Sequence, residues 1–376
     1  MTKTKPADLK KILKLKDDLI EGFGAESVMM ASDIPQRPLI SSGSLALDFA
    51  LGGGMPTDRL VEVAGPESTG KTTLALLTMQ QFLDAQPERG ALILDVEHKM
   101  SSDWVEQIIG PERMQRVILA WPDTAEQATD LYTKAVKSGQ ISFVLFDSIA
   151  GAPTQRITEK SAEIGNVGGN ALAITRFAQL ASIYSQKHNT LTFCVNQVRD
   201  DIAGYHRVIT PGGRALKHAC TLRIQLKKGK GKVDEEVNGE KIQVGYTVVG
   251  KVVKNHQAPE GRTAWWWFLS IPTEKYGFGV DVDEEVVRLA VMLKIITTSG
   301  GWYSHAELPG GKIQGLARLT EYIKDHPDFV GSLGAQVRGS MAKNGAIVAP
   351  ISDPEAPPVE PEKIEHLLSG EDVDSF

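Results

Sequence analysis

The stretch Gly65-Pro66-Glu67-Ser68-Thr69-Gly70-Lys71-Thr72-Thr73 directly follows the apolar run Leu60-Val61-Glu62-Val63-Ala64. Its spacing, G-x-x-x-x-G-K-T, is typical of the phosphate-binding loop of nucleotide-binding ATPases. The glycines let the backbone turn several N–H groups toward one phosphate, and the next helix adds its positive N-terminal end. The stretch therefore predicts a strand, a phosphate-binding loop and a helix from Thr72 to about Leu83.

Two side chains of this loop carry the predicted chemistry. Lys71 can reach the β- and γ-phosphates of a nucleoside triphosphate, and the Thr72 hydroxyl can ligate Mg²⁺. The cofactors that the motif predicts are ATP and Mg²⁺.

The composition limits the class of protein. The chain has 376 residues, 41% of them hydrophobic and 23% charged, which is enough for a full core and more than one domain. No apolar run approaches the roughly 18 residues that span a bilayer. The lysine-rich N-terminus lacks the apolar segment of a signal peptide, so we expect a cytoplasmic protein without a membrane partner. Cys194 and Cys220 lie in apolar, strand-like runs without metal-ligand spacing, which predicts reduced core thiols.

Negative charge is concentrated at the C-terminus. Eight acids and one lysine follow residue 352, so this tail contributes −7 to a net charge of −6 and leaves +1 for the rest of the chain. Any site for a polyanion must therefore be local. The tail is also rich in proline and too poor in apolar residues to fold alone.

Apolar strands alternate with helices through the first half of the chain. The predicted strands there are 91–95, 117–120, 142–147 and 190–196, with a long helix over 170–187 and a capped helix from Asp123-Thr124 to Gly139. This alternation predicts a mostly parallel sheet covered on both faces. The later runs 221–226, 246–253 and 264–271 have no helix between them, so we expect them to extend the sheet as antiparallel strands.

The fold class expected is therefore α/β, a phosphate-loop ATPase core with an N-terminal helix and a small C-terminal α+β domain. The predicted segments are an N-terminal helix and oligomerisation arm (1–36), an ATPase and DNA-binding core (37–272), the small domain (273–345) and an acidic tail (346–376). Helix 283–294 is the clearest element of the small domain. The N-terminal helix has two open interpretations, a lysine-rich solvated face on a packed helix or an arm that docks on a neighbouring subunit.

Polar residues follow the ends of successive predicted strands, where ligands bind in parallel α/β sheets. Asp147 has the form of an aspartate that supports Mg²⁺ through water. Glu97 is placed to orient or deprotonate the attacking water, and Asp95 is a weaker candidate for that base. Gln197 carries an amide that could sense the γ-phosphate.

Two long segments, Thr158–Gly169 and Val198–Gly213, are polar, rich in glycine and without periodicity. We interpret them as loops that contact DNA, with surface loops of no such role as the alternative. The predicted contacts are Gly165 and Asn166 in the first segment, and Arg199, Ile202, Arg207 and Arg214 in or after the second. Asp200 and Asp201 count against a simple basic patch.

Two further runs have simpler explanations. Lys227-Lys228-Gly229-Lys230-Gly231-Lys232 would attract phosphate, but a charged hairpin tip between two strands is the favoured interpretation. Trp265-Trp266-Trp267 presents alternate residues to opposite faces of a strand, so core and interface packing explains it better than base stacking.

Over roughly residues 5 to 345 the chain resembles the bacterial RecA recombinase family. The motifs that carry the resemblance are Ser42–Asp48 with Gly52-Gly53-Gly54, the Gly65–Thr72 loop, Glu97-His98, Gln127-Ala128, Asp147-Ser148, Asn196–Arg199, Gly212–Lys217 and Val252–Asn255. The resemblance implies an ATP-dependent helical filament on single-stranded DNA that pairs with a homologous duplex and exchanges strands, in recombination and DNA repair.

By position, the resemblance also implies roles for single residues. Lys71 and Thr72 would bind nucleotide and Mg²⁺, Glu97 would activate water, and Asp147 would support the metal. Gln197 would couple the γ-phosphate to the second DNA-binding segment, which includes Gly212 and Gly213. Trp104 falls where the family stacks an aromatic ring on adenine. Lys254 would reach the ATP of a neighbouring protomer.

Several positions depart from the family pattern, and two of them belong to the expected nucleotide site. His256 stands where a second lysine is usual, and a neutral imidazole neutralises less transition-state charge. Ser101 stands in place of an aspartate of the adenine pocket. These departures fit a diverged member, such as one encoded by a phage. Two other classes remain as alternatives: a ring-forming helicase or clock-type ATPase of the same fold, and a DNA-bound scaffold that signals damage.

Overall fold

The computed structural model describes residues 8–25, 27–34, 38–153, 169–200, 208–237, 239–273 and 277–343. Its contacts divide the chain into two units, Met1–Pro38 and Leu39–Phe376. The predicted DNA contacts Gly165, Asn166, Ile202 and Arg207 and the acidic tail lie outside the described residues. Among the helices described, none is long and apolar enough to cross a membrane.

The first unit contains helix α1 (Leu9–Phe23) and the short 3₁₀ helix η1 (Ala31–Asp33). The Asp8 carboxylate accepts a hydrogen bond from the Lys10 N–H, and Gly24 ends α1 with a positive φ of 86°. No residue of α1 is buried, and its apolar side chains Leu9, Ile12, Leu13, Leu15, Leu19 and Phe23 are exposed. The predicted amphipathic helix is confirmed, and its docking on a neighbouring subunit stays a prediction.

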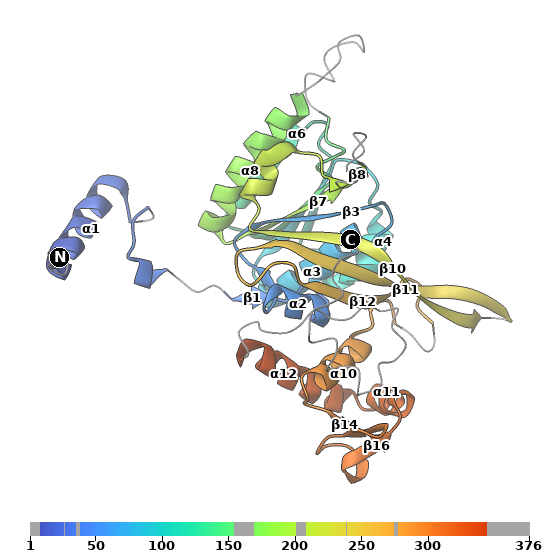
Figure 1. Ribbon diagram of the computed structural model, residues 1–376. Coiled ribbons are helices and arrows are strands. Elements are labelled where there is room, and N and C mark those ends of the chain that lie inside the picture. Colours follow the sequence, from blue (N-terminus) through green and yellow to red (C-terminus); the bar gives the residue numbers. More distant parts are fainter. Residues whose placement is uncertain are drawn as a thin grey trace. The chain divides into compact units, whose positions relative to one another are not determined.

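A nine-stranded sheet organises the second unit (Figure 1), in the order β13-β12-β11-β10-β3-β7-β6-β4-β5. From β10 to β5 neighbouring strands are parallel, and β11, β12 and β13 are antiparallel to their neighbours. Its strands are β3 (Leu60–Gly65), β4 (Gly90–Asp95), β5 (Val117–Ala120), β6 (Ile141–Asp147), β7 (Leu191–Gln197), β10 (Leu222–Val237), β11 (Glu240–Asn255), β12 (Thr263–Leu269) and β13 (Gly279–Val280). The predicted parallel sheet with an antiparallel extension is confirmed.

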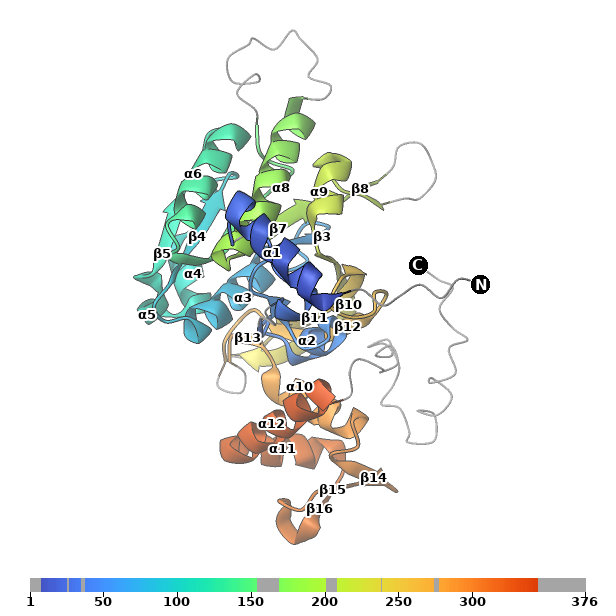
Figure 2. The ribbon, with the colours of Figure 1, turned by 90° about the vertical axis from the view of Figure 1, so that its left-hand side faces the viewer.

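Helices cover both faces of this sheet (Figure 2). Helices α2 (Leu45–Leu51), α3 (Lys71–Ala85) and α4 (Ser102–Ile109) share one apolar cluster with Val61 and Val63, and the short α5 (Pro111–Met114) follows α4. Helices α6 (Ala125–Lys137), α8 (Gly169–His188) and α9 (Gly213–Ala219) share the other with Leu60. Alternate apolar residues of β3 thus face opposite cores, which explains why they do not alternate with exposed polar residues.

Local signals set the helix ends as the sequence predicts. Thr124 Oγ1 accepts a hydrogen bond from the Gln127 N–H at 3.1 Å, and Gln127 Oε1 accepts one from the Asp123 N–H at 2.6 Å. These reciprocal bonds satisfy donors that the first turn of α6 would leave unpaired. Short strand pairs complete the unit, β1 (Leu39–Ile40) with β2 (Met55–Pro56) and β8 (Arg199–Asp200) with β9 (Val208–Ile209).

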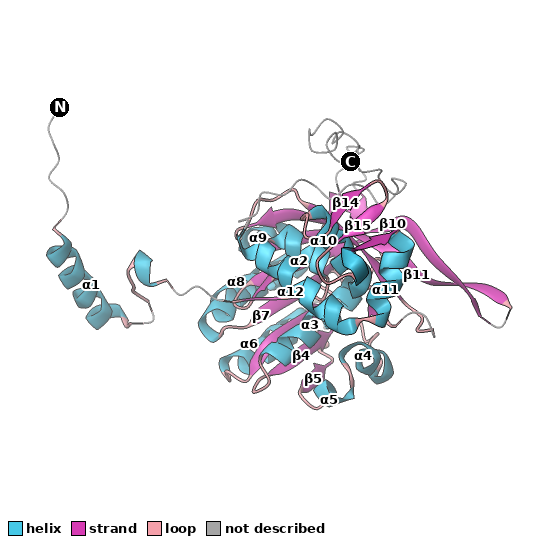
Figure 3. Ribbon diagram, turned by 90° about the horizontal axis from the view of Figure 1, so that it is seen from below, coloured by secondary structure: helices cyan, strands magenta, loops and turns pink. Residues whose placement is uncertain are grey.

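The prediction that the run Lys227–Lys232 is a hairpin tip is wrong. The run lies inside β10, because β10 and β11 each extend for 16 residues and turn only after Val237 (Figure 3). The glycines serve close packing instead of a turn. A Cβ atom on Gly231 would lie 2.7 Å from side-chain atoms of both Thr247 and Trp267.

Residues 282–343 form a small α+β region with its own apolar cluster. Its elements are α10 (Val282–Met292), β14 (Thr297–Ser299), β15 (Trp302–Ser304), η2 (Pro309–Gly311), β16 (Lys312–Gln314), α11 (Leu316–Asp325) and α12 (Pro327–Lys343). Leu45 and Phe49 of α2 belong to the same cluster, so this region packs on the core. The fully buried Glu285 accepts hydrogen bonds from Ser44 Oγ at 2.6 Å and from the Leu45 N–H at 2.8 Å. The division at residue 272 stays a prediction.

The three tryptophans of β12 divide between faces, as predicted. Trp266 is buried in the core, whereas the Arg288 guanidinium lies 3.8 Å from the ring centre of Trp265. Trp267 packs edge-on against Trp265.

Candidate active site

The phosphate-loop sequence connects β3, which ends at Gly65, to α3, which begins at Lys71. Ser68 and Gly70 adopt positive φ angles of 59° and 85°. A Cβ on Gly65 would lie 2.5 Å from the Leu226 carbonyl oxygen, so only glycine fits beside β10. The Lys71 ammonium donates to the Pro66 carbonyl at 2.5 Å, within the loop itself.

Thr72, in the first turn of α3, contacts Asp147 at the carboxyl end of β6. Thr72 Oγ1 donates to Asp147 Oδ2 at 2.6 Å. Burial raises the pKa of Asp147 to about 6, despite the Thr72 hydrogen bond, and the neighbouring Glu97 and Asp95 add to the shift. Burial also lowers the pKa of Lys71, which the carboxylates of Asp147, Glu67 and Glu97 partly offset.

Glu97 lies beyond the end of β4 and joins this group. Its Oε1 accepts a very short hydrogen bond from Ser148 and a longer one, 3.5 Å, from Gln197 Nε2. Its Oε2 forms an ion pair with Lys99 Nζ at 2.5 Å. Partial burial raises the pKa of Glu97, but the Lys99 and Ser148 hydrogen bonds and the positive charges outweigh it and hold the pKa below its usual value. Glu97 therefore stays ionised at neutral pH.

Asp95, the weaker candidate base, is engaged elsewhere. Its two carboxylate oxygens accept hydrogen bonds from the backbone N–H groups of Lys99 and Met100, at 3.3 and 3.0 Å. It holds the turn that carries Glu97 away from the strand end. Because both oxygens of Asp95 already accept hydrogen bonds from the backbone, Glu97 is the better candidate for the base that deprotonates water.

The structure thus brings together Lys71, Thr72, Asp147, Glu97 and Gln197 from four different segments. Two of the three partners of Glu97, Ser148 and Lys99, have no role predicted from the sequence. Ser148 could have been found because it directly follows Asp147. Nothing in the sequence signals that the side chain of Lys99 turns back onto Glu97.

Other predicted residues lie outside this group. Trp104 is in the first turn of α4, partly buried against the core, and its backbone N–H donates to Ser101 Oγ at 3.3 Å. Ser101 is therefore the N-cap of α4. Lys254 of β11 donates to the carbonyls of Lys217 and His218 at the end of α9, both at 3.0 Å.

The described candidates for DNA contact gather at the start of α9. Arg199 pairs with Ile209 in the β8–β9 ladder, and Gly212 follows with a φ of 94°. Gly213 and Arg214 begin α9, and both are exposed. The ladder thus holds Arg199 close to the residues that precede α9.

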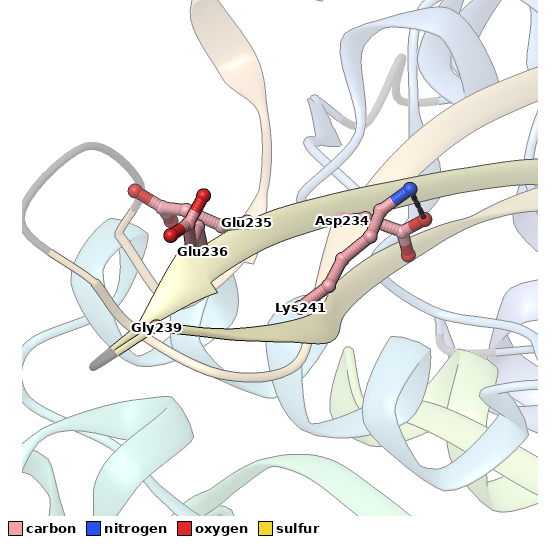
Figure 4. A pocket seen from close by; sticks show the side chains of 5 residues that line it. All are labelled: Asp234, Glu235, Glu236, Gly239 and Lys241. Carbon is pink, nitrogen blue, oxygen red and sulfur yellow. Dashed lines mark ion pairs between the residues drawn. The ribbon is translucent and has the colours of Figure 1, made fainter.

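An open pocket of about 300 Å³ lies at the tip of the β10–β11 hairpin and does not include any of these residues. Asp234, Glu235, Glu236, Gly239 and Lys241 line it (Figure 4). Lys241 and Asp234 form an ion pair across it at 3.2 Å. Its predominantly acidic lining is unsuited to a nucleotide phosphate.

The residues that follow the carboxyl ends of β3, β4, β6 and β7 include the ligand groups that a complex of Mg²⁺ with a nucleotide requires. The hydroxyl of Thr72 and the carboxylate of Asp147 are oxygen ligands of the kind that Mg²⁺ prefers, and the ammonium of Lys71 suits phosphate oxygens. The residues present therefore fit ATP and Mg²⁺.

Comparison with known proteins agrees with this geometry. The family model described as the RecA N-terminal domain matches residues 10–269. The chain belongs to the RecA family. Over 340 residues it is 33% identical to the RecA proteins of Listeria seeligeri and Listeria welshimeri, covering 89% of this chain and 92% of each relative. RecA of Listeria monocytogenes is 32% identical over the same span. A crystal structure of the RadB recombinase covers 61% of this chain and 95% of its own, with 23% identity and a TM-score of 0.47.

The resemblance to the RecA family and the predicted fold class are therefore confirmed. As a RecA-family protein, the chain is an ATP-dependent recombinase with DNA-dependent ATPase activity. The roles of its individual residues remain predictions.

The raised pKa of Asp147 leads to a prediction about stability. In buffer without Mg²⁺ or nucleotide, we expect Asp147→Asn to raise the free energy of unfolding by about 3 kcal/mol near pH 8. Above pH 6 the folded wild type must keep a carboxylate ionised in a buried site, whereas below about pH 4 it is protonated in both states and the difference disappears. Urea unfolding at both pH values measures it.

Asp130→Asn is the matched control, because Asp130 is exposed on α6. It should change stability by less than about 0.5 kcal/mol at either pH. An Asp147→Asn gain that is equal at high and low pH would contradict the prediction.

Proposed function

We propose that this RecA-family chain assembles into a helical filament on single-stranded DNA, pairs that strand with a homologous duplex and exchanges strands while it hydrolyses ATP. The observation that carries the proposal is the meeting of Lys71, Thr72, Asp147, Glu97 and Gln197 at the loop edge of the sheet. Phosphate-binding, metal-binding and water-activating groups then occupy one site.

Each side chain has a role that its position supports. The Lys71 ammonium, held beside the loop backbone, binds the β- and γ-phosphate oxygens. Thr72 ligates Mg²⁺, and Asp147 supports the metal through water. When bound, Mg²⁺ supplies neutralisation of the negative charge that develops on the phosphates. Trp104 at the start of α4 is assigned to the adenine ring.

Glu97 receives the proton of the attacking water. Its carboxylate is held from one side by Ser148 and from the other by Lys99, which fixes its orientation before water enters. Gln197, at hydrogen-bond distance from Glu97, is placed to respond to the γ-phosphate. This response passes from the end of β7 through the β8–β9 pair towards Arg214.

Lys254 is assigned to the site of the neighbouring protomer. Within its own chain its ammonium donates to carbonyls at the end of α9, away from the residues around Lys71. The exposed apolar side chains of α1 support a second contact between protomers, since they lack burial in their own unit. We place the protein in the cytoplasm, with single-stranded DNA, duplex DNA and further copies of itself as partners.

Two alternatives predict different assemblies. A ring-forming helicase of the same fold would give closed rings and ATP-driven unwinding. A damage-signalling scaffold would keep its function when hydrolysis is abolished. The resemblance to RecA over 89% of the chain favours the filament-forming recombinase.

The decisive experiment combines imaging with turnover. With single-stranded DNA and a non-hydrolysable ATP analogue, negative-stain electron microscopy should show helical filaments, and ATP hydrolysis should rise at least about tenfold on addition of single-stranded DNA. Arg214→Ala should lower the affinity for DNA and weaken its dependence on salt. Closed rings, or hydrolysis indifferent to DNA, would overturn the proposal.

A further inference from the structure

Glu62 is a buried acid in the strand that leads into the phosphate loop. Only 1% of it is exposed, and both its carboxylate oxygens have partners from neighbouring strands. Oε2 forms an ion pair with Arg223 Nε at 2.5 Å, and Oε1 accepts from Asn196 Nδ2 at 2.7 Å. The three residues lie on β3, β10 and β7, which are adjacent in the sheet (Figure 1).

Asn196 uses both ends of its amide. Nδ2 donates one hydrogen to Glu62 and the other to the Pro211 carbonyl at 2.8 Å, while Oδ1 accepts from the Gln197 N–H at 3.0 Å. Because the carboxylate and the carbonyl are both acceptors, only the NH₂ group of the amide fits between them. An aspartate has the same shape but lacks both donors.

Arg223 holds the residue that precedes Pro211. Its Nη2 donates to Thr210 Oγ1 at 3.4 Å, and Thr210 is 3% exposed. Thr210 and Pro211 are therefore attached to the sheet through two different side chains. They connect β9 to the start of α9, where Arg214 lies.

The hydrogen bonds of Glu62, Asn196 and Arg223 form a buried network, and Asn196 also connects this network to Glu97. Asn196 bonds to the backbone of Gln197, and the side chain of Gln197 contacts Glu97 at 3.5 Å. Hydrogen bonds of Gln197 and Asn196, together with the backbone that joins these two residues, thus connect Glu97 to Pro211, two residues before the start of α9.

We propose that Glu62, Asn196 and Arg223 are positioning residues that fix Thr210-Pro211 relative to Gln197. Binding of DNA beside Arg214 and hydrolysis at Glu97 then influence each other through this buried network. The inference rests on the proposed function, since it requires that DNA binds at the start of α9.

A purely structural role makes a different prediction. Buried ion pairs contribute little net stability in many proteins, and spatial continuity alone does not establish coupling between sites. A structural role would change stability, nucleotide affinity and turnover together. A positioning role changes the response to DNA selectively.

The test uses Asn196→Asp in the full-length chain. We expect the stimulation of ATP hydrolysis by poly(dT) to fall at least about tenfold, while the affinity for a fluorescent non-hydrolysable ATP analogue changes less than about threefold. Thr210→Val, which removes only the Arg223 contact, should lower stimulation about threefold. Thr192→Val is the control, because Thr192 is a buried residue of β7 that bonds Tyr132 and Ser185 instead.

The outcomes of these measurements either support or overturn the inference. Stimulation within about twofold of wild type in both variants, or a loss that only parallels the Thr192→Val control at a similar melting temperature, overturns the inference. If Asn196→Asp does not fold, Thr210→Val decides alone: unchanged stimulation overturns the inference and reduced stimulation with normal nucleotide affinity supports it. A wild type that DNA does not stimulate overturns the proposed function first, and the inference with it.

Discussion

Lys71→Met is expected to lower the rate of ATP hydrolysis by about 10³-fold. The methionine keeps the length of the side chain but removes the ammonium that lies against the phosphate loop at Pro66. Burial already disfavours the charge on Lys71, and the nearby carboxylates compensate only in part, so its loss leaves the folded chain stable. Steady-state hydrolysis and binding of a fluorescent ATP analogue measure the effect.

Lys134→Met supplies the matched control, since Lys134 is an exposed residue of α6. It should leave turnover within about twofold of wild type. A Lys71→Met chain that keeps more than about a tenth of wild-type hydrolysis would show that Lys71 does not bind the reacting phosphates.

Glu97→Gln is expected to lower hydrolysis by about 10² to 10⁴-fold while nucleotide binding is retained. The glutamine preserves the shape and can still accept the Ser148 hydrogen bond, but it cannot take a proton from water. Filaments should therefore form with ATP and fail to dissociate. Single-turnover hydrolysis, together with the rate of release from single-stranded DNA, checks both parts.

Asp95→Asn distinguishes the two candidate bases. Asp95 holds the turn at Lys99 and Met100, and asparagine keeps only one acceptor oxygen, so the substitution should remove one of the two hydrogen bonds and cost about 1 kcal/mol of stability. Hydrolysis should fall less than about tenfold. A larger loss in Asp95→Asn than in Glu97→Gln would assign the base to Asp95.

The site residues at the sheet edge could be predicted because of strand geometry. The carboxyl ends of parallel strands lie at the same edge of the sheet. Asp147, Glu97 and Gln197 can therefore be placed at one edge once their strands are identified. The identity of the partners around Glu97 could not be predicted in the same way. Lys99 reaches Glu97 through a turn that depends on Asp95, and no periodic pattern describes such a turn.

Two predictions from the sequence failed because the local structure depends on packing between strands that are distant in the sequence. Lys227–Lys232 was interpreted as a hairpin tip because glycines usually mark turns. Gly231 instead allows Thr247 and Trp267 to approach the backbone of β10, and neither neighbour is evident before the strands are paired. Glu62 was counted within an apolar strand for the same reason, since Arg223 comes beside it only through the order β10-β3-β7.

The capping of α2 by Glu285 has a consequence for how the chain is made. Ser44 and Leu45, at the start of α2, bond to a carboxylate 240 residues further along the chain. On the ribosome, α2 therefore emerges long before its partner is synthesised. Because domains fold from the N-terminus as they appear, the sheet can assemble first, and α2 reaches its final environment only when α10 is synthesised. The packing of α2 in the core is therefore complete only after the small C-terminal region has been synthesised.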